Sequence, residues 1–215
     1  MDSFTIDTSE QGSEEWHKAR LGKLTASRAG DIMKKQRNGQ PYATRKNYLT
    51  ELALERITQE IPEQVESEAM RNGTELERVA ALAYSFATGN ETEQTGFWHN
   101  DTYGASPDDL IVGKNGGVEY KNPMASTHYQ TLQDQTIPEH YYWQIIQCLL
   151  VTGRDFWDYV SHCPAFPPNS QLFIKRVTRE EAKKDIDSLA VELKKANKEI
   201  EEQVNYINNY KRTNQ

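Results

Sequence analysis

The chain has 215 residues, 36% of them hydrophobic, and carries a formal net charge of -7 at pH 7. This length suits one domain with one hydrophobic core. The acidic balance argues against a protein that coats nucleic acid with a broad basic surface, but it leaves room for an enzyme with a few cations in a groove. We therefore expect a single domain over residues 1–215, with a core over about 11–177 and a C-terminal helix over about 178–210.

The hydropathy of the chain and its first residues lead us to expect a soluble, intracellular protein. No stretch of the sequence approaches the roughly 20 apolar residues of a membrane span. The first residues, Met-Asp-Ser-Phe-Thr-Ile-Asp, lack the basic and apolar regions of a secretion signal. Cys148 and Cys163 lack metal-ligand spacing, so we expect free thiols in or near the core. The expected location is the cytoplasm, without membrane contact.

The first predicted helix begins near Ser13 and ends at Gly22. Serine is a good N-cap residue, two glutamates follow it, and glycine is typical of a helix C-terminus. A second helix start follows at Ser27, so Arg20 and Ser27 flank one turn. A helix N-terminus beside a hydroxyl and a guanidinium suits a phosphate site. The alternative is an arginine in a salt bridge and a serine that only caps its helix.

Two longer helices are predicted over about 42–59 and 67–88, because hydrophobic residues recur there every three or four positions. Gly89 ends the second of them. We expect its core face to comprise Val79, Ala80, Leu82, Ala83 and Phe86. Glu77 lies at the margin of this face. Its carboxylate either points toward the charged hairpin that follows or is solvated like an ordinary helix glutamate.

The stretch from Ser106 to Pro123 predicts a β-hairpin that gathers charged side chains. Its turn, residues 113–117, is rich in residues that tolerate positive φ. Side chains two apart in a strand share a face, so Glu119 and Lys121 point the same way and the hairpin brings Asp108 near them. Two carboxylates suit a hard divalent cation, and the lysine suits orienting a water or steadying an anion. The alternative is a surface hairpin with an ordinary Glu–Lys ion pair.

The other predicted elements are strands over about 93–98, 156–161 and 171–177, and helices over about 126–136, from Pro138 to Val151, and from Thr178 onward. The helix after Pro138 is apolar nearly all round and should be buried. Gln144 and Gln147 interrupt it, either as hydrogen-bonded core residues or as groups that face a catalytic pocket. The last helix has one apolar stripe, which packs on the core or meets a neighbouring subunit.

Four sequence blocks stand in one order along residues 11–177. They are Trp16-His17-Lys18-Ala19-Arg20-Leu21-Gly22 with Thr25-Ala26-Ser27, Gly73-Thr74-Glu75-Leu76-Glu77, Ser106-Pro107-Asp108 with Glu119-Tyr120-Lys121-Asn122-Pro123, and Tyr142-Trp143-Gln144 in a helix that ends Val151-Thr152-Gly153. Each block alone is a weak signal, but together they closely resemble the bacteriophage lambda exonuclease family of viral-type recombination exonucleases. The resemblance implies a restriction-endonuclease-like α/β fold, with a central mixed β-sheet flanked by helices.

The resemblance also implies a metal site. Asp108, Glu119 and the backbone carbonyl of Tyr120 would ligate Mg²⁺, for which Mn²⁺ would substitute. Lys121 would position or activate the attacking water. Glu77 would support the metal cluster, at a second site or through water.

A DNA-end site follows from the same resemblance. Arg20, Ser27 and Ser106 would hold the 5′-phosphate of the DNA end. Gln144 matches the first of two glutamines on the family's helix. Gln147 stands one residue beyond the second position, so the resemblance assigns it no role.

The implied activity is an Mg²⁺-dependent exonuclease that degrades the 5′ strand of linear double-stranded DNA, releases 5′-mononucleotides and leaves 3′ single strands. Family members are often ring-shaped trimers and commonly work beside a phage single-strand annealing protein. We therefore expect a homo-oligomer, with a trimer favoured, encoded by a phage or prophage and acting in the bacterial host cytoplasm. The alternatives are a DNA endonuclease of the same fold and a non-catalytic DNA-end-binding protein.

Overall fold

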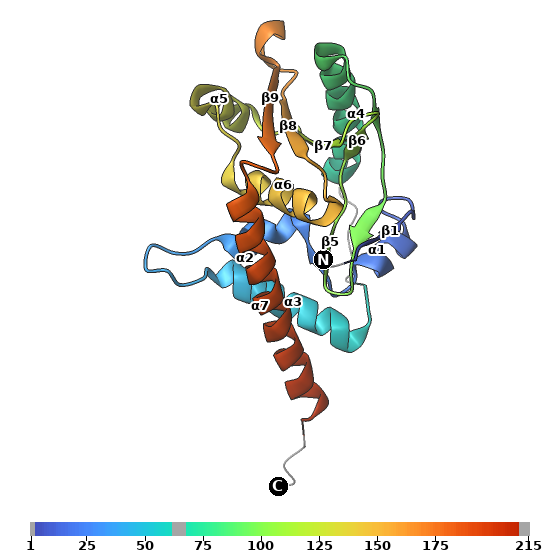
Figure 1. Ribbon diagram of the computed structural model, residues 1–215, viewed down its shortest axis with the longest axis vertical. Helices are drawn as coiled ribbons and strands as arrows, with labels where there is room; N and C mark the ends of the chain where they lie inside the picture. The colour runs from blue at the N-terminus through green and yellow to red at the C-terminus, as the bar shows by residue number, and fades with distance from the viewer. Residues whose placement is uncertain (1–2, 62–67, 211–215) are drawn as a thin grey trace.

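The computed structural model describes residues 3–61 and 68–210, with side chains described from residue 75 onward in the second range. A five-stranded mixed sheet with the strand order β3-β6-β7-β8-β9 forms its centre (Figure 1). The strands are β3 (Thr92–Glu93), β6 (Asp109–Ile111), β7 (Gly116–Lys121), β8 (Phe156–His162) and β9 (Leu172–Thr178). β7 and β8 run parallel and the other pairs are antiparallel, which confirms the predicted α/β class with a central mixed sheet.

A second sheet has four strands in the order β1-β4-β5-β2. They are β1 (Thr5–Asp7), β2 (Leu24–Thr25), β4 (Phe97–His99) and β5 (Tyr103–Ala105). β2 and β5 pair in parallel, and the other pairs are antiparallel. Residues 106–108 follow β5 and lead directly into β6, so this short segment joins the two sheets.

The single strand expected over 93–98 is instead two strands in different sheets. Gly96 lies between them, where an added Cβ atom would stand 1.9 Å from the carbonyl oxygen of Asp7. The chain therefore approaches the end of β1 at a distance that only glycine permits, and then pairs antiparallel with it. The prediction of one continuous strand was wrong because this close approach is a tertiary contact.

The helices of the described chain are α1 (Glu14–Arg20), α2 (Ala29–Met33), α3 (Ala43–Thr58), α4 (Glu68–Thr88), α5 (Ala125–Asp134), α6 (Glu139–Thr152) and α7 (Lys183–Asn208), with 3₁₀ turns η1 (Ala26–Arg28) and η2 (Pro168–Ser170). They confirm the helices predicted from hydrophobic periodicity to within a few residues. Ser13 caps α1 as expected, because its hydroxyl accepts a hydrogen bond from the backbone N–H of Trp16 at 3.2 Å.

Helices cover both faces of the central sheet. α4 packs on one face, where Tyr84 contacts the ring of Tyr120 at a centroid distance of 6.2 Å. α6 packs on the other face. Side chains alternate along a strand, so Glu119 and Lys121 of β7 point away from α4 and toward α6. Gln144 of α6 accordingly reaches Glu119 across this face.

The long C-terminal helix uses its apolar stripe within the chain. α7 lies across α2 and α3 (Figure 1) and also contacts α6. The stripe residues buried there are Ile186, Leu189, Leu193, Ala196 and Ile200. Of the two expectations for this stripe, packing on the core is therefore confirmed over most of the helix. Ile207, near its end, is 49% exposed.

The predicted core face of α4 was largely wrong. Leu82 is 72% exposed and Phe86 is 95% exposed, whereas Ala80 and Tyr84 are fully buried. The hydroxyl of Tyr84 donates to the buried carboxylate of Asp158 at 2.7 Å. This buried polar anchor explains the helix rotation, because it turns the Tyr84 side of α4 toward the sheet.

Both cysteines are buried free thiols, as expected. The half of α6 that follows Gln144 is buried, while its first turns are only partly covered. None of the helices in the described ranges combines the length and the apolar character that a membrane crossing requires.

Candidate active site

The hairpin of β6 and β7 places two carboxylates opposite each other. Asp109 pairs with Val118, so the next position along the antiparallel register sets Asp108 opposite Glu119. The backbone N–H of Tyr120 donates to Oδ2 of Asp108 at 2.7 Å, which fixes this carboxylate at the end of the hairpin. The structure therefore brings Asp108 and Glu119 together as the sequence predicts.

Glu119 receives two side-chain donors on one oxygen. Nζ of Lys121 and Nε2 of Gln144 both lie 2.5 Å from its Oε1. The other oxygen, Oε2, is buried and has no hydrogen-bond partner in the described chain. A buried carboxylate oxygen without a donor is costly unless a cation binds it, so this atom is where a metal ion fits.

The electrostatics of the site show that one positive charge does not balance its carboxylates. Burial, and then the charge of Asp108, raise the pKa of Glu119 to about 8. Burial also raises the pKa of Asp108. Burial lowers the pKa of Lys121, but the carboxylates of Glu119 and Asp108 outweigh it and raise this pKa above its ordinary value. A divalent cation would relieve the repulsion between the two acids.

Glu77 stands at the edge of this site. Burial, and then the charge of Asp108, raise the pKa of Glu77 to about 7. In the part of the chain that the structure describes, no three His, Cys, Asp or Glu side chains converge closely enough to hold a metal. The candidate side-chain ligands are thus Asp108 and Glu119, both hard oxygen donors suited to Mg²⁺ or Mn²⁺. Direct ligation by Glu77 or by the Tyr120 carbonyl stays a prediction.

A guanidinium without a carboxylate partner lies beside the metal site. Nη1 of Arg20 donates to Oγ of Ser106 at 2.8 Å, and its carbon Cζ lies 4.0 Å from the ring centroid of Trp16 and 5.3 Å from that of Phe97. Burial lowers the pKa of Arg20 to about 10, although Tyr48 and the charge of Glu55 oppose this shift, and among the described residues Arg20 forms no ion pair. A partly buried, positioned guanidinium without a salt bridge is suited to bind a phosphate.

Ser27 is placed less closely than expected. It is exposed on η1, and its Oγ lies 3.4 Å from the hydroxyl of Thr25. Within the described ranges, no hydrogen bond joins Ser27 to Arg20 or Ser106. Its role at the phosphate site therefore stays a prediction, while the pairing of Arg20 with Ser106 is a feature of the structure.

The two glutamines of α6 have different environments. Gln144 donates to Glu119 and belongs to the candidate site. Gln147 is fully buried, and its Nε2 donates to the carbonyls of Leu24 and Gly104, both at 2.9 Å. It thereby ties β2 to β5 and is a structural residue of the core. The sequence left both possibilities open for both residues, and the structure assigns one to each.

Sequence reasoning missed a basic hairpin, residues 34–41. It extends from the body of the molecule between α2 and α3 (Figure 1), and its base is closed by a bridge between Lys35 and Pro41. From Ile32 to Thr50 the sequence has no acidic residue, although the whole chain has 32. The basic residues of that run are Lys34, Lys35, Arg37, Arg45 and Lys46. The absence of acidic residues from this run could have indicated the local positive surface from the sequence alone.

A groove of about 690 Å³ opens on the α4 side of the site. Glu77, Asp108 and Tyr120 are among the residues that line it, as are Leu82 and Asn90. The carboxylate of Asp108 therefore borders an open space on this side.

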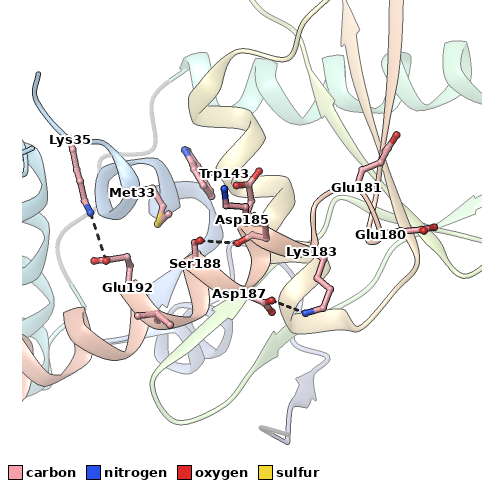
Figure 2. Close-up of a pocket in the computed structure, with 12 residues that line it drawn as sticks. Met33, Lys35, Trp143, Glu180, Glu181, Lys183, Asp185, Asp187, Ser188 and Glu192 are labelled. Carbon is pink, nitrogen blue, oxygen red and sulfur yellow. Dashed lines mark hydrogen bonds and ion pairs between the residues drawn. The ribbon is translucent and has the colours of Figure 1, made fainter.

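A second cavity, of about 920 Å³, lies away from the carboxylates, between the end of α2, α6 and the start of α7. Lys183 pairs with Asp187 at 2.6 Å and Lys35 lies 3.8 Å from Glu192, and both contacts are drawn as dashed lines in Figure 2. Acidic side chains outnumber lysines in its lining, so its field does not favour a nucleic-acid phosphate.

Residues 15–155 match the YqaJ-like viral recombinase domain. The chain belongs to this family. The YqaJ-like match spans all the candidate site residues, from Arg20 to Gln144. No curated protein sequence is a match for the chain.

Among solved structures, an alkaline exonuclease is similar to this YqaJ-like chain. The chain is 34% identical to this enzyme, LHK-Exo from Laribacter hongkongensis, with a TM-score of 0.80. The match covers 91% of this chain and 96% of LHK-Exo. A structure of LHK-Exo in complex with dAMP matches equally well. A phage-related exonuclease from Haemophilus somnus 129PT shares the fold, with 13% identity, a TM-score of 0.71 and coverage of 86% and 96%. These relations support an exonuclease role and confirm the resemblance to the lambda exonuclease family.

Proposed function

We propose that this chain is a metal-dependent exonuclease that degrades the 5′ strand of linear double-stranded DNA and leaves 3′ single strands. The observation that carries the proposal is the unpartnered, buried Oε2 of Glu119 beside Asp108. It is the atom expected to bind a cation in a nuclease of this family, and it lies on the same hairpin as Lys121. The complex of LHK-Exo with dAMP supports a mononucleotide as the released unit.

Asp108 and Glu119 would hold Mg²⁺, or Mn²⁺ in its place. When bound, the ion would lower the pKa of a water and offset the charge that develops on the phosphate. The amide of Gln144 donates to Oε1 of Glu119 and so leaves Oε2 for the cation. Lys121 holds its ammonium at Oε1 as well, where it can orient the attacking water and steady the anionic phosphate.

The polarity of the reaction would come from Arg20 and Ser106. Ser106 is two residues before Asp108, so a 5′-phosphate held by Arg20 would lie close to the cleavage site. A bound terminal phosphate sets which bond reaches the metal, and nucleotides would leave stepwise from the 5′ end. Phosphate contacts carry no base information, so we expect little sequence specificity.

The basic hairpin is our proposed contact for the DNA duplex. Two of its cations, Lys34 and Arg37, form no ion pair within the described residues, so they would attract the phosphate backbone, whereas Lys35 lies near Glu192. We further propose a homo-oligomer, with a trimer favoured, a phage single-strand annealing protein as partner, and action in the bacterial host cytoplasm. These assembly and partner proposals come from the lambda exonuclease resemblance.

Digestion of labelled DNA tests the proposal. Linear duplex with 5′-phosphate ends should release mononucleotides in the presence of Mg²⁺, while the 3′ strand and covalently closed circles persist. Asp108→Ala, Glu119→Ala and Lys121→Ala should each abolish turnover while the circular dichroism spectrum stays unchanged. Equal attack on closed circles would favour the endonuclease alternative, and DNA binding without turnover in any metal would favour the end-binding alternative.

A further inference from the structure

The guanidinium of Arg20 is carried by a tight turn. The N–H of Lys23 donates to the carbonyl of Arg20 at 3.0 Å, so Arg20 is the first residue of a β-turn. Leu21 has φ -54 and ψ 126, and Gly22 has φ 67, which are the angles of a type II turn. The position of Gly22 therefore sets where the main chain of Arg20 lies.

Two consecutive residues at the end of α3 hold both backbone groups of Gly22. Its N–H donates to Oε2 of Glu55 at 2.7 Å, and its carbonyl accepts from Nε of Arg56 at 2.8 Å. An added Cβ atom at Gly22 would stand 2.6 Å from Cγ of Arg56, so the turn and the helix are in close contact. A surface turn can satisfy such groups with water, whereas this one is tied to two charged side chains.

The same helix supports the chain beyond the turn. The hydroxyl of Tyr48 accepts a hydrogen bond from the N–H of Thr25 at 2.9 Å. Arg56 is itself anchored, because its Nη2 donates to Oδ1 of Asn197 on α7 at 2.8 Å. α3 thus holds the segment that follows Arg20 at two points, and α7 braces one of them.

We propose that Glu55 and Arg56 are positioning residues for the phosphate site of Arg20. Glu55 acts through Gly22: its carboxylate accepts the Gly22 N–H, and its charge attracts Arg20 without an ion pair between the two side chains. The guanidinium of Arg20 therefore keeps its charge for a 5′-phosphate while its main chain is fixed. This inference rests on the proposed function, because it assumes that Arg20 binds the terminal phosphate of DNA.

Equilibrium binding without turnover provides the test. Fluorescence anisotropy of the full chain, in EDTA, would compare labelled linear duplexes that differ only in a 5′-phosphate or a 5′-hydroxyl. Glu55→Ala should weaken binding of the phosphorylated duplex by about tenfold and leave the hydroxyl duplex nearly unchanged, as expected when the acceptor that holds the Gly22 N–H is removed. Glu55→Gln keeps an oxygen acceptor for Gly22 and should retain the wild-type discrimination.

Two further variants make the result decisive. Asn47→Ala, on the exposed side of α3, is the matched control and should bind as the wild type does. Glu55→Asp keeps the charge but shortens the reach to Gly22, and replaces Glu55→Ala if that variant does not fold. The inference would be overturned if Glu55→Asp and Glu55→Ala still bound the 5′-phosphate duplex more tightly than the 5′-hydroxyl duplex by the wild-type factor. It would also be overturned if these variants lost the same affinity for both duplexes. Equal affinity of the wild-type protein for the two duplexes would instead refute the phosphate site itself.

Discussion

The guanidinium of Arg20 and the hydroxyl of Ser106 are hydrogen-bonded at 2.8 Å, although 86 residues separate them in the sequence. The parallel pairing of β2 with β5 brings them together, because Leu24 lies opposite Tyr103. Ser106 then leads within two residues to Asp108. The proposed phosphate site and the proposed metal site are therefore parts of one surface.

Arg20→Lys should remove the preference for phosphorylated ends. A lysine keeps one charge but loses the planar fork that stacks on Trp16 and donates to Ser106. We expect kcat/KM on 5′-phosphorylated linear duplex to fall about tenfold to a hundredfold, with a much smaller change on 5′-hydroxyl ends. Single-turnover and steady-state digestion of the two substrates measure this. An equal fall on both would place Arg20 outside the phosphate site.

Metal affinity should rise with pH. The pKa of Glu119 is raised to about 8 by burial and by Asp108, so below that pH the carboxyl holds a proton that a cation must displace. Affinity for Mn²⁺ should therefore increase from about pH 6 to about pH 9 and then level off. Calorimetry in buffers with different ionisation enthalpies would also detect the released protons. An affinity independent of pH would contradict the protonated state inferred for Glu119.

The basic hairpin should supply part of the salt-dependent affinity for duplex DNA. The double variant Lys34→Ala with Arg37→Ala should weaken binding equally on unrelated sequences. It should reduce the slope of log K against log salt by about 0.9 for each DNA phosphate that is no longer neutralised. Lys183→Ala with Lys198→Ala removes two exposed lysines of α7 and serves as the control. If both double variants showed the same slope of log K against log salt, the hairpin would not be part of the DNA contact surface.

The two glutamines of α6 should separate activity from stability. Gln147→Leu leaves the carbonyls of Leu24 and Gly104 without their buried donor, so we expect a loss of about 1–3 kcal/mol in the free energy of unfolding. Gln144→Leu should lower turnover with a smaller effect on stability, because it loosens Glu119. Urea unfolding and digestion assays on both variants measure the two effects. A loss of stability in Gln144→Leu together with a loss of turnover in Gln147→Leu would contradict these two assignments.

The central hairpin could be predicted from the sequence because its geometry is local. The alternation of a strand places Glu119 and Lys121 on one face, and the antiparallel turn brings back Asp108. The local sequence also marked Arg20 as a candidate phosphate ligand, and the family resemblance added Ser106. Their contact depends on strands far apart in the chain.

Other features could not be predicted from local patterns. Periodicity placed Leu82 and Phe86 in the core, but the rotation of α4 depends on Tyr84 reaching Asp158, 74 residues away. The roles of Gln144 and Gln147 likewise depend on which strand each faces. The basic hairpin was predictable in principle, because the absence of acids over residues 32–50 is visible in the sequence.

The proposed chemistry depends most on Asp108 and Glu119 sharing a divalent ion. A crystal soaked in Mn²⁺, with anomalous scattering recorded at the manganese edge, tests this directly. We predict one anomalous peak between the carboxylate of Asp108 and Oε2 of Glu119. A peak elsewhere with none at this position, or side chains of Asp108 and Glu119 that point apart, would contradict the proposed metal site.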